Sequence, residues 1–350
     1  MNAGAADRRE GGAWRSGQRL KNDLIYALSA CALGILSLLP RAMLTTLGRW
    51  VGRLAYVAFP GARRTAQENA ARLRPEASPA LQRALARRCY ARLGEHLGDV
   101  VAMLGGAPLA PLPFASGGAL VLERAIGEGH GVLFVSAHLG PWERVAGSVV
   151  AAGVPLTTLA RDAYDPRFTR LYDRLRSSLG VRVVYRGGPG ASSRILRVLK
   201  EGGVLGVPMD LRSRVPSIPS PFLGSPAPTA VGPARIALRT GAAVVVATVA
   251  RRGADLALTV TRIPAADLAP GTAGEHALTS RINEELGARI MALPHEWVLM
   301  HPRWPPVTRA SASSYSVILS EAKDPPDPAR FSQEGDARRL GDPSSLRSSG

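Results

Sequence analysis

Apolar and polar positions alternate in blocks between residues 117 and 293, and these blocks predict alternating strands and helices. Short apolar runs rich in valine predict strands at 131–138, 154–161, 181–185, 203–209, 243–249 and 256–263. Helical patterns lie between or beside them, at 120–128, 141–150, 166–179, 192–200, 233–239 and 274–293. Continuously apolar strands alternating with helices are typical of a sheet buried on both faces. The chain is therefore expected to form a single α/β domain over residues 61–306, with a mostly buried central sheet flanked by helices.

An uncharged run precedes this domain, LIYALSACALGILSLLP at residues 24–40. Its 17 residues are at the lower limit of a membrane span. Basic side chains lie on both flanks, at Arg15, Arg19 and Lys21 before the run and at Arg41, Arg49 and Arg53 after it. This arrangement favours an N-terminal hydrophobic membrane-associated helix over a signal peptide or a core helix. Whether the helix spans the bilayer or lies on it stays open at this stage.

The next segments extend the helical region. Residues 43–59 combine apolar positions with basic ones, as expected of an interfacial helix, and Pro60-Gly61 is expected to end it. Residues 23–60 are thus predicted to hold the membrane anchor and interfacial helices. A long helix over 78–103, rich in alanine, leucine and arginine, is expected to pack on the main body.

Both ends of the chain differ in composition from its centre. Residues 1–22 are polar and basic and are predicted to form a disordered arm. Residues 307–350 hold serine, proline, aspartate and arginine without any period, and they are predicted to form a disordered tail.

The charge of the chain limits the classes of partner that we expect. The formal net charge is +17, while residues 309–350 carry six basic and six acidic side chains, so the excess lies on residues 1–308. A basic surface implies an anionic partner, such as an anionic membrane or an acidic protein. Nucleic acid is disfavoured, because neither an aromatic RNA-binding signature nor a zinc-finger spacing is present. The two cysteines exclude a disulfide framework and a four-cysteine metal site.

The candidate chemistry centres on His138 in the string Val132-Leu-Phe-Val-Ser-Ala-His-Leu-Gly-Pro-Trp-Glu143. An apolar strand ends at the histidine, a Gly-Pro turn follows, and Glu143 begins a helix. A glutamate at this distance is expected to turn back and hold the imidazole, which leaves the other ring nitrogen free to accept a proton from a hydroxyl. The alternatives are a core imidazole at His138 and a helix-capping charge at Glu143. A metal site is not expected, because the HExxH spacing is absent.

Three further residues are candidates for binding a substrate. Asp210 follows the strand 203–209 in the same way that His138 follows its own, and is either a substrate-facing carboxylate or a loop N-cap. Arg161 closes the strand 154–161, and Arg176 lies on the following helix. Both arginines are expected to contact phosphate or another anionic head group, or else to belong to a solvated face.

These residues, together with several others, resemble the bacterial lipid A biosynthesis (lauroyl/myristoyl) acyltransferases within the lysophospholipid acyltransferase superfamily. The shared signature is the His-x4-Asp/Glu motif, here His138 and Glu143. Further similar stretches are Arg64–Asn69 with Leu73 and Pro75, Pro208-Met209-Asp210, Pro221–Gly224, Thr229–Gly232 and His295–Trp304. They cover about residues 20–306. Leu211 and Pro302 depart from the family pattern.

The resemblance implies transfer of an acyl group from a thioester, usually on acyl carrier protein, to a hydroxyl of a glycolipid at the cytoplasmic face of the bacterial inner membrane. His138 would deprotonate the hydroxyl and Glu143 would orient the imidazole. Backbone N–H groups near Gly140–Trp142, or Arg161, would stabilise the oxyanion. No cofactor is expected. A basic surface would dock the acidic carrier protein and the anionic membrane.

Alternative functions share the same motif. The acceptor could instead be a phosphatidylinositol mannoside, an ornithine lipid or another glycolipid, and the donor could be coenzyme A. A hydrolase would release free fatty acid without an acceptor. A non-catalytic membrane adaptor would keep the fold only, but the intact His138–Glu143 pair argues against that.

Overall fold

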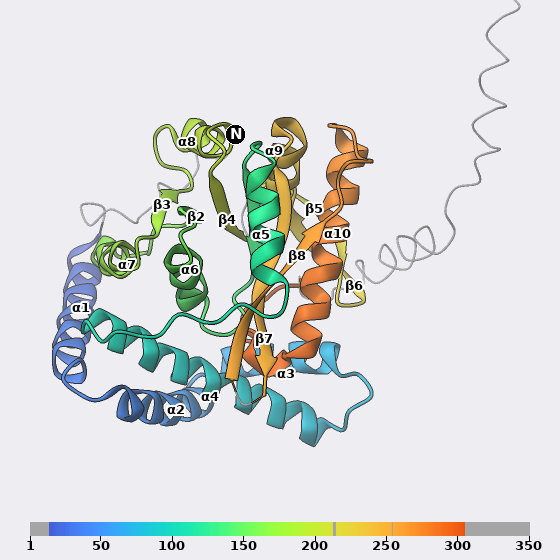
Figure 1. The fold of residues 1–350 in the computed structure, drawn as a ribbon. Helices are drawn as coiled ribbons and strands as arrows, with labels where there is room; N and C mark the ends of the chain where they lie inside the picture. Colours follow the sequence, from blue (N-terminus) through green and yellow to red (C-terminus); the bar gives the residue numbers. More distant parts are fainter. Residues whose placement is uncertain (1–13, 213–214, 254, 305–350) are drawn as a thin grey trace, which may run out of the picture. The chain divides into compact units, whose positions relative to one another are not determined.

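A six-stranded sheet forms the centre of the computed structural model, which describes residues 14–212, 215–253 and 255–304 (Figure 1). Its strands are β1 (Val132–Ser136), β2 (Leu156–Ala160), β3 (Arg182–Tyr185), β4 (Val204–Pro208), β7 (Ala243–Arg252) and β8 (Asp255–Ile263). They lie in the order β3-β2-β4-β1-β7-β8. The first five run parallel, and β8 pairs antiparallel with β7. This confirms the predicted α/β class.

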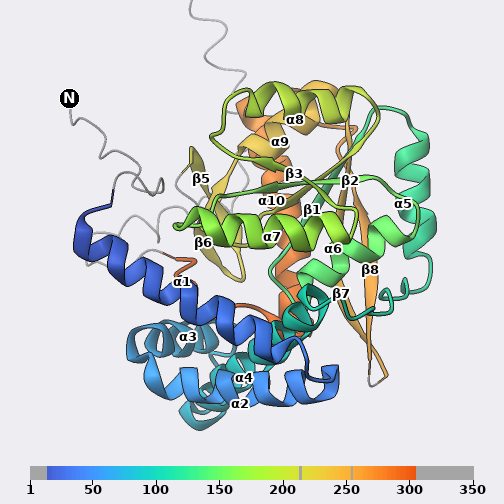
Figure 2. The ribbon, with the colours of Figure 1, turned by 90° about the vertical axis from the view of Figure 1, so that its left-hand side faces the viewer.

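Helices cover both faces of this sheet. They are α5 (Gly118–Gly127), α6 (Trp142–Ala151), α7 (Pro166–Ser178), α8 (Ala191–Lys200), α9 (Gly232–Thr240) and α10 (Thr272–Ala292). Figures 1 and 2 show α6 and α7 on one face and α10 on the other. Residues 132–135 of β1 are at most 2% exposed, because β1 is an inner strand with helices above and below it. This burial accounts for the continuous apolar runs of the sequence.

The N-terminal helices gather at one end of the sheet, away from α8 and α9 (Figures 1 and 2). They are α1 (Ser16–Leu36), α2 (Arg41–Ala58), α3 (Pro60–Leu73) and α4 (Pro79–Leu104). One expectation was wrong here: residues 16–22 belong to α1 and not to a disordered arm. Pro60 follows the end of α2 as expected, and it also begins α3, as proline favours the first helical turn. The remaining arm, 1–13, and the predicted tail, 307–350, lie outside the described residues.

Glycines bring α2 and α4 into backbone contact. Gly48 and Gly52 on α2 face Gly94 and Gly98 on α4. A Cβ atom added to Gly48 would lie 2.1 Å from the carbonyl oxygen of Gly94, which no side chain tolerates. The close approach requires glycine at these positions, so the opposite face of α2 is turned away from the protein.

Helix α1 packs against the sheet domain through α7. Tyr26 contacts Phe168 edge to face, with ring centroids 5.7 Å apart. Asp23 forms an ion pair of 2.7 Å with Arg167. Across the described ranges, no helix is both long and apolar enough to cross a membrane. The uncharged run of residues 24–40 is instead divided, since α1 ends at Leu36 and α2 begins at Arg41.

A two-stranded hairpin, β5 (Ser217–Phe222) and β6 (Ser225–Ala230), is absent from the sequence-based expectations. Its four prolines, Pro219, Pro221, Pro226 and Pro228, argue against strands in a central sheet. A separate hairpin tolerates them because its edges are not paired further. The turn residues Leu223 and Gly224 both have positive φ angles, as a tight two-residue hairpin turn requires.

Candidate active site

The parallel pairing of β1 and β4 brings His138 and Asp210 together. The two strands are in register from Val132 opposite Val204 to Ser136 opposite Pro208. His138 lies two residues beyond Ser136, and Asp210 lies two residues beyond Pro208. The two side chains therefore meet at the carboxyl edge of the sheet, where α/β enzymes bind their ligands.

Three N–H groups converge on the Asp210 carboxylate, which is completely buried. Oδ1 lies 3.0 Å from Nδ1 of His138. Oδ2 accepts a hydrogen bond of 2.9 Å from the backbone N–H of His138 and one of 2.8 Å from Nε1 of Trp297. Because Nδ1 is bound by the carboxylate, Nε2 is the ring nitrogen left for a substrate.

His138 and Asp210 each shift the pKa of the other. Burial disfavours the charged imidazole, but the negative charge of Asp210 and its hydrogen bond outweigh burial and raise the pKa of His138 above its ordinary 6.5. Burial also disfavours the Asp210 carboxylate, yet the charge and hydrogen bonds of His138 and the Trp297 N–H lower its pKa. Asp210 is thus held as an anion beside the imidazole.

Glu143 does not hold the imidazole, contrary to the sequence-based expectation. Its carboxylate forms a two-pronged ion pair with Arg176 of α7, at 2.8 Å to Nη2 and 3.2 Å to Nε. Glu143 lies in the first turn of α6, which packs beside α7. Its carboxylate is therefore closest to the two N–H donors of the Arg176 guanidinium. Arg176 was expected to contact a substrate anion, but this pairing occupies it. Together they tie α6 to α7 beside His138.

Glu143→Gln is therefore expected to act mainly on stability. Gln leaves the mostly buried Arg176 guanidinium without its counter-ion, and breaking a buried pair in this way costs about 3–5 kcal/mol of unfolding free energy. Denaturant unfolding of the purified variant measures the loss. The double variant Glu143→Gln/Arg176→Gln should recover part of it, because neither charge is then buried alone. Equal stability of the wild type and the single variant would contradict this reading.

The turn after His138 is fixed by backbone contacts. The Gly140 N–H donates to the Glu296 carbonyl at 2.9 Å, and the Trp142 N–H donates to the Gly140 carbonyl at 3.0 Å. Pro141 has no N–H. Gly140, Pro141 and Trp142 themselves thus offer no free backbone N–H to an oxyanion, while Arg161 is still available for this role.

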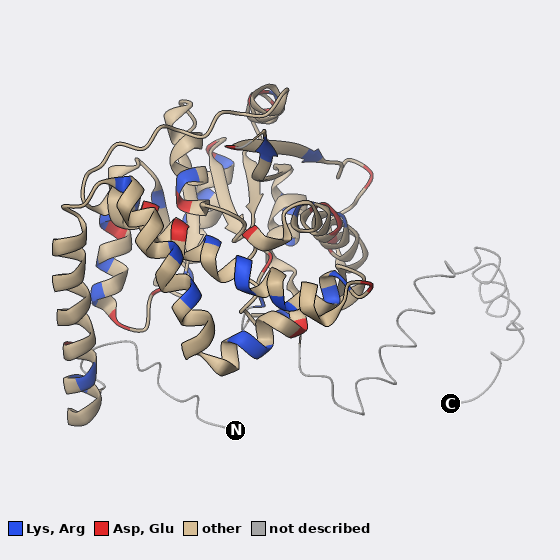
Figure 3. Cartoon of the chain, turned by 90° about the horizontal axis from the view of Figure 1, so that it is seen from below, with Lys and Arg blue, Asp and Glu red and all other residues tan. Residues whose placement is uncertain are grey.

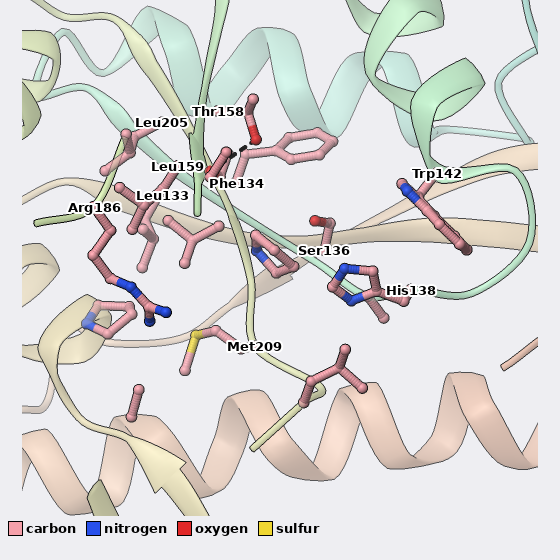
Figure 4. A pocket seen from close by; sticks show the side chains of 18 of the residues that line it. Leu133, Phe134, Ser136, His138, Trp142, Thr158, Leu159, Arg186, Leu205 and Met209 are labelled. Carbon is pink, nitrogen blue, oxygen red and sulfur yellow. Dashed lines mark hydrogen bonds between the residues drawn. The ribbon is translucent and has the colours of Figure 1, made fainter. Parts of the chain in front are cut away.

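A cavity of about 1060 Å³ opens beside His138. Its walls include apolar side chains from the sheet and from α8, among them Leu133, Leu205 and Ile195. Figure 4 shows His138 with Trp142 on one side of it and Arg186 on the other. The rings of His138 and Trp142 meet edge to face, with centroids 5.2 Å apart. The cavity thus combines apolar walls with basic side chains and has the His138 imidazole at its edge.

Comparison with known proteins decides the family. The family model for bacterial lipid A biosynthesis acyltransferases matches residues 17–305. The chain belongs to this family. The match confirms the resemblance drawn from the motifs, and it extends from α1 through the whole described sheet domain.

Two curated relatives of this acyltransferase-family chain are phosphatidylinositol mannoside acyltransferases of Mycobacterium tuberculosis, from strains CDC 1551 and H37Rv. Each is 26% identical over 190 residues, which is 54% of this chain and 59% of the relative. The chain thus matches somewhat more than half the length of these relatives.

The family motifs that are far apart in the sequence meet around Asp210. The side-chain amide of Asn69 donates to the backbone carbonyls of Leu299 and His301, at 2.8 and 2.9 Å. Buried Arg303 binds the β6 hairpin strand through the Pro228 carbonyl and the Thr229 hydroxyl. The closing segment 295–304 is therefore held from two sides, which places the Trp297 indole against Asp210. Residue spacing does not predict a role for Trp297 at the site. The sequence indicates this residue only as part of the family motif at His295–Trp304.

Proposed function

We propose that this chain transfers a fatty acyl group from an acyl carrier protein thioester to a hydroxyl of a glycolipid acceptor of the lipid A precursor type. The observation that carries the proposal is the His138–Asp210–Trp297 chain of hydrogen bonds at the edge of a large cavity with apolar and basic walls. The family to which the chain belongs supports the same reaction class.

In this reaction His138 acts as the general base. Its Nε2 takes the proton of the acceptor hydroxyl while the oxygen attacks the thioester carbonyl carbon. The new C–O bond forms, the C–S bond breaks, and the leaving thiolate takes the proton from the imidazolium. No acyl-enzyme is needed, because the acceptor oxygen is itself the nucleophile.

Asp210 is proposed to perform the orienting role that was first assigned to Glu143. It keeps the Nδ1 proton in place and stabilises the imidazolium that forms during attack. Trp297 in turn holds Asp210 through the second carboxylate oxygen. Arg161, on the cavity wall, is the candidate to face the oxyanion or an anionic part of the substrate.

A phosphatidylinositol mannoside is the second candidate acceptor, and the two relatives named above favour it. Both candidate acceptors are glycolipids with a hydroxyl to acylate, and the arrangement around His138 serves either. The choice between them depends on the head group, which the acceptor comparison described below resolves.

An exposed apolar stripe on α2 supports a membrane partner. Met43, Leu47, Trp50, Leu54 and Val57 follow each other at spacings of three and four residues, and each is more than 40% exposed. They lie on the face of α2 opposite the glycine contact with α4. A continuous exposed apolar face of this kind marks an interaction site. We place it on the surface of an anionic membrane, with the cavity at the cytoplasmic face of the bacterial inner membrane.

The charges around this stripe fit the same partner. Figure 3 views the molecule from this side and shows more lysine and arginine than aspartate and glutamate on its helices. Arg53 lies over the Trp50 ring at 4.7 Å, as expected of an interfacial pair. The basic surface is also proposed to attract the acidic acyl carrier protein.

The double substitution Leu54→Glu/Val57→Glu is expected to weaken binding to vesicles of phosphatidylethanolamine and phosphatidylglycerol by about tenfold or more, because two apolar groups no longer enter the interface. Both side chains are about two thirds exposed, so the fold should persist. Vesicle sedimentation measures the change. Leu196→Glu, on α8 at the other end of the sheet, is the control and should bind as the wild type does. Unchanged vesicle binding by the double variant would show that α2 does not contact the membrane.

The experiment that tests the proposed function is acyl transfer by the purified full chain. Labelled acyl carrier protein is the donor, and a lipid A precursor and a mannosylated phosphatidylinositol are offered separately as acceptors. Label on either acceptor supports the proposal and identifies the head group. Label in free fatty acid alone would indicate a hydrolase, and no turnover of the thioester would contradict the proposal.

A further inference from the structure

Three arginines that line the cavity have no ion-pair partner among the described residues. Arg161 follows β2 and Arg186 follows β3, and the two strands pair so that Ala160 lies opposite Tyr185. Arg212 follows β4, the next strand in the sheet. All three line the cavity that holds His138. Neighbouring parallel strands thus deliver three guanidinium groups to the same edge of the sheet.

The other arginines of the cavity are neutralised. Arg176 is paired with Glu143, and Arg235 is paired with Glu275 at 2.8 Å. Within residues 14–212, 215–253 and 255–304, no carboxylate forms an ion pair with Arg161, Arg186 or Arg212. The cavity therefore carries an uncompensated positive charge, which raises the local concentration of anions.

The position of Arg186 indicates a role inside the cavity. Its side chain is half-buried, and Figure 4 shows it across the cavity from His138, with Leu133 and Met209 between them. Its backbone N–H donates to the Ala160 carbonyl at 2.9 Å, which fixes its base against β2. An unpaired and half-buried guanidinium beside the cavity is available to bind an anion.

We propose that Arg161, Arg186 and Arg212 form a phosphate-binding subsite of the cavity. Guanidinium groups bind phosphate oxygens in pairs of hydrogen bonds, and three of them suit a tetrahedral group better than a single planar carboxylate. The inference rests on the proposed acyl transfer, because both of its substrates supply this chemistry. The donor thioester is borne on a phosphopantetheine arm, and the lipid acceptor bears a phosphate in its head group.

Two matched substrate pairs separate these sources. The donor pair is acyl-4′-phosphopantetheine and acyl-pantetheine, and the acceptor pair is a phosphorylated lipid A precursor and its dephosphorylated form. For each pair, the readout is the ratio of kcat/KM with phosphate to kcat/KM without it. The variants are the single substitutions and the triple Arg161→Gln/Arg186→Gln/Arg212→Gln. Arg197→Gln, an exposed change on α8 outside the cavity, is the control.

The triple variant is expected to lower this ratio about tenfold or more for one of the pairs, since charge-assisted contacts are lost only where phosphate is present. A fall in the donor ratio assigns the phosphopantetheine phosphate, and a fall in the acceptor ratio assigns the head-group phosphate. Added salt should lower the wild-type ratio in the same direction. Ratios that equal the wild-type values for both pairs would overturn the subsite.

The subsite and the proposed function fail in different ways. If the wild type transfers no acyl group, the proposed function is contradicted, and calorimetry then tests the subsite directly with 4′-phosphopantetheine and with the phosphorylated acceptor. Weaker binding of either probe by the triple variant would still support the subsite. Equal affinities of the wild type and the triple variant for both probes would refute it.

Discussion

His138→Ala is expected to lower the rate of acyl transfer by roughly 10²–10⁴, the usual contribution of a positioned acid–base group. The loss should appear in kcat, because the imidazole acts on the proton of the acceptor and not on binding of the acyl chain. Steady-state kinetics of the purified variant beside the wild type measures it.

The fold of the His138→Ala variant should persist. The side chain of His138 is 29% exposed, and Asp210 would keep its hydrogen bonds from the backbone of residue 138 and from Trp297. Circular dichroism and thermal unfolding are the controls. A folded variant that retains near wild-type activity would show that His138 is not the base.

Asp210→Asn is expected to lower the rate by roughly 10²–10⁴ as well, for a different reason. Three N–H groups point at this carboxylate. An asparagine has one oxygen and one NH2 group, so at least one donor would face another donor. The imidazole would then adopt the wrong tautomer or turn away from the acceptor.

The pH dependence identifies this role. A general base must be neutral, and the carboxylate raises the pKa of His138 above 6.5, so the acidic limb of the kcat/KM profile should lie above that pH in the wild type. Removing the negative charge lowers the pKa, which moves the limb to lower pH in Asp210→Asn. A limb that stays in place while the rate falls would indicate a structural role alone. The double variant Glu143→Gln/Arg176→Gln is the comparison, since it removes one negative and one positive charge whose effects on the pKa of His138 oppose each other.

Much of the fold could be predicted from the sequence. The valine-rich runs around β1, β4 and β7 are apolar throughout because these strands are buried on both faces, and this burial makes the pattern visible without a structure. The hairpin β5–β6 was missed because its prolines obscure any strand pattern. Helix α3 was missed because proline both ends one helix and begins the next.

The exposed face of α2 could be predicted only in part from the sequence. The sequence indicates a helix with apolar and basic faces at residues 43–59. It does not show which face packs on the protein, because glycines carry no hydrophobic signal. The structure places Gly48 and Gly52 against α4, and only that contact turns the apolar stripe outward.

The sequence by itself determined the fold class, the position of His138 at a strand end and the family, because each depends on residues close together in the chain or on the order of motifs. The tertiary structure alone decided which carboxylate serves His138. Glu143 is five residues away and Asp210 is 72, yet β1 pairs with β4 and places Asp210 at the imidazole. Sheet pairing is a long-range choice, and local spacing does not encode it.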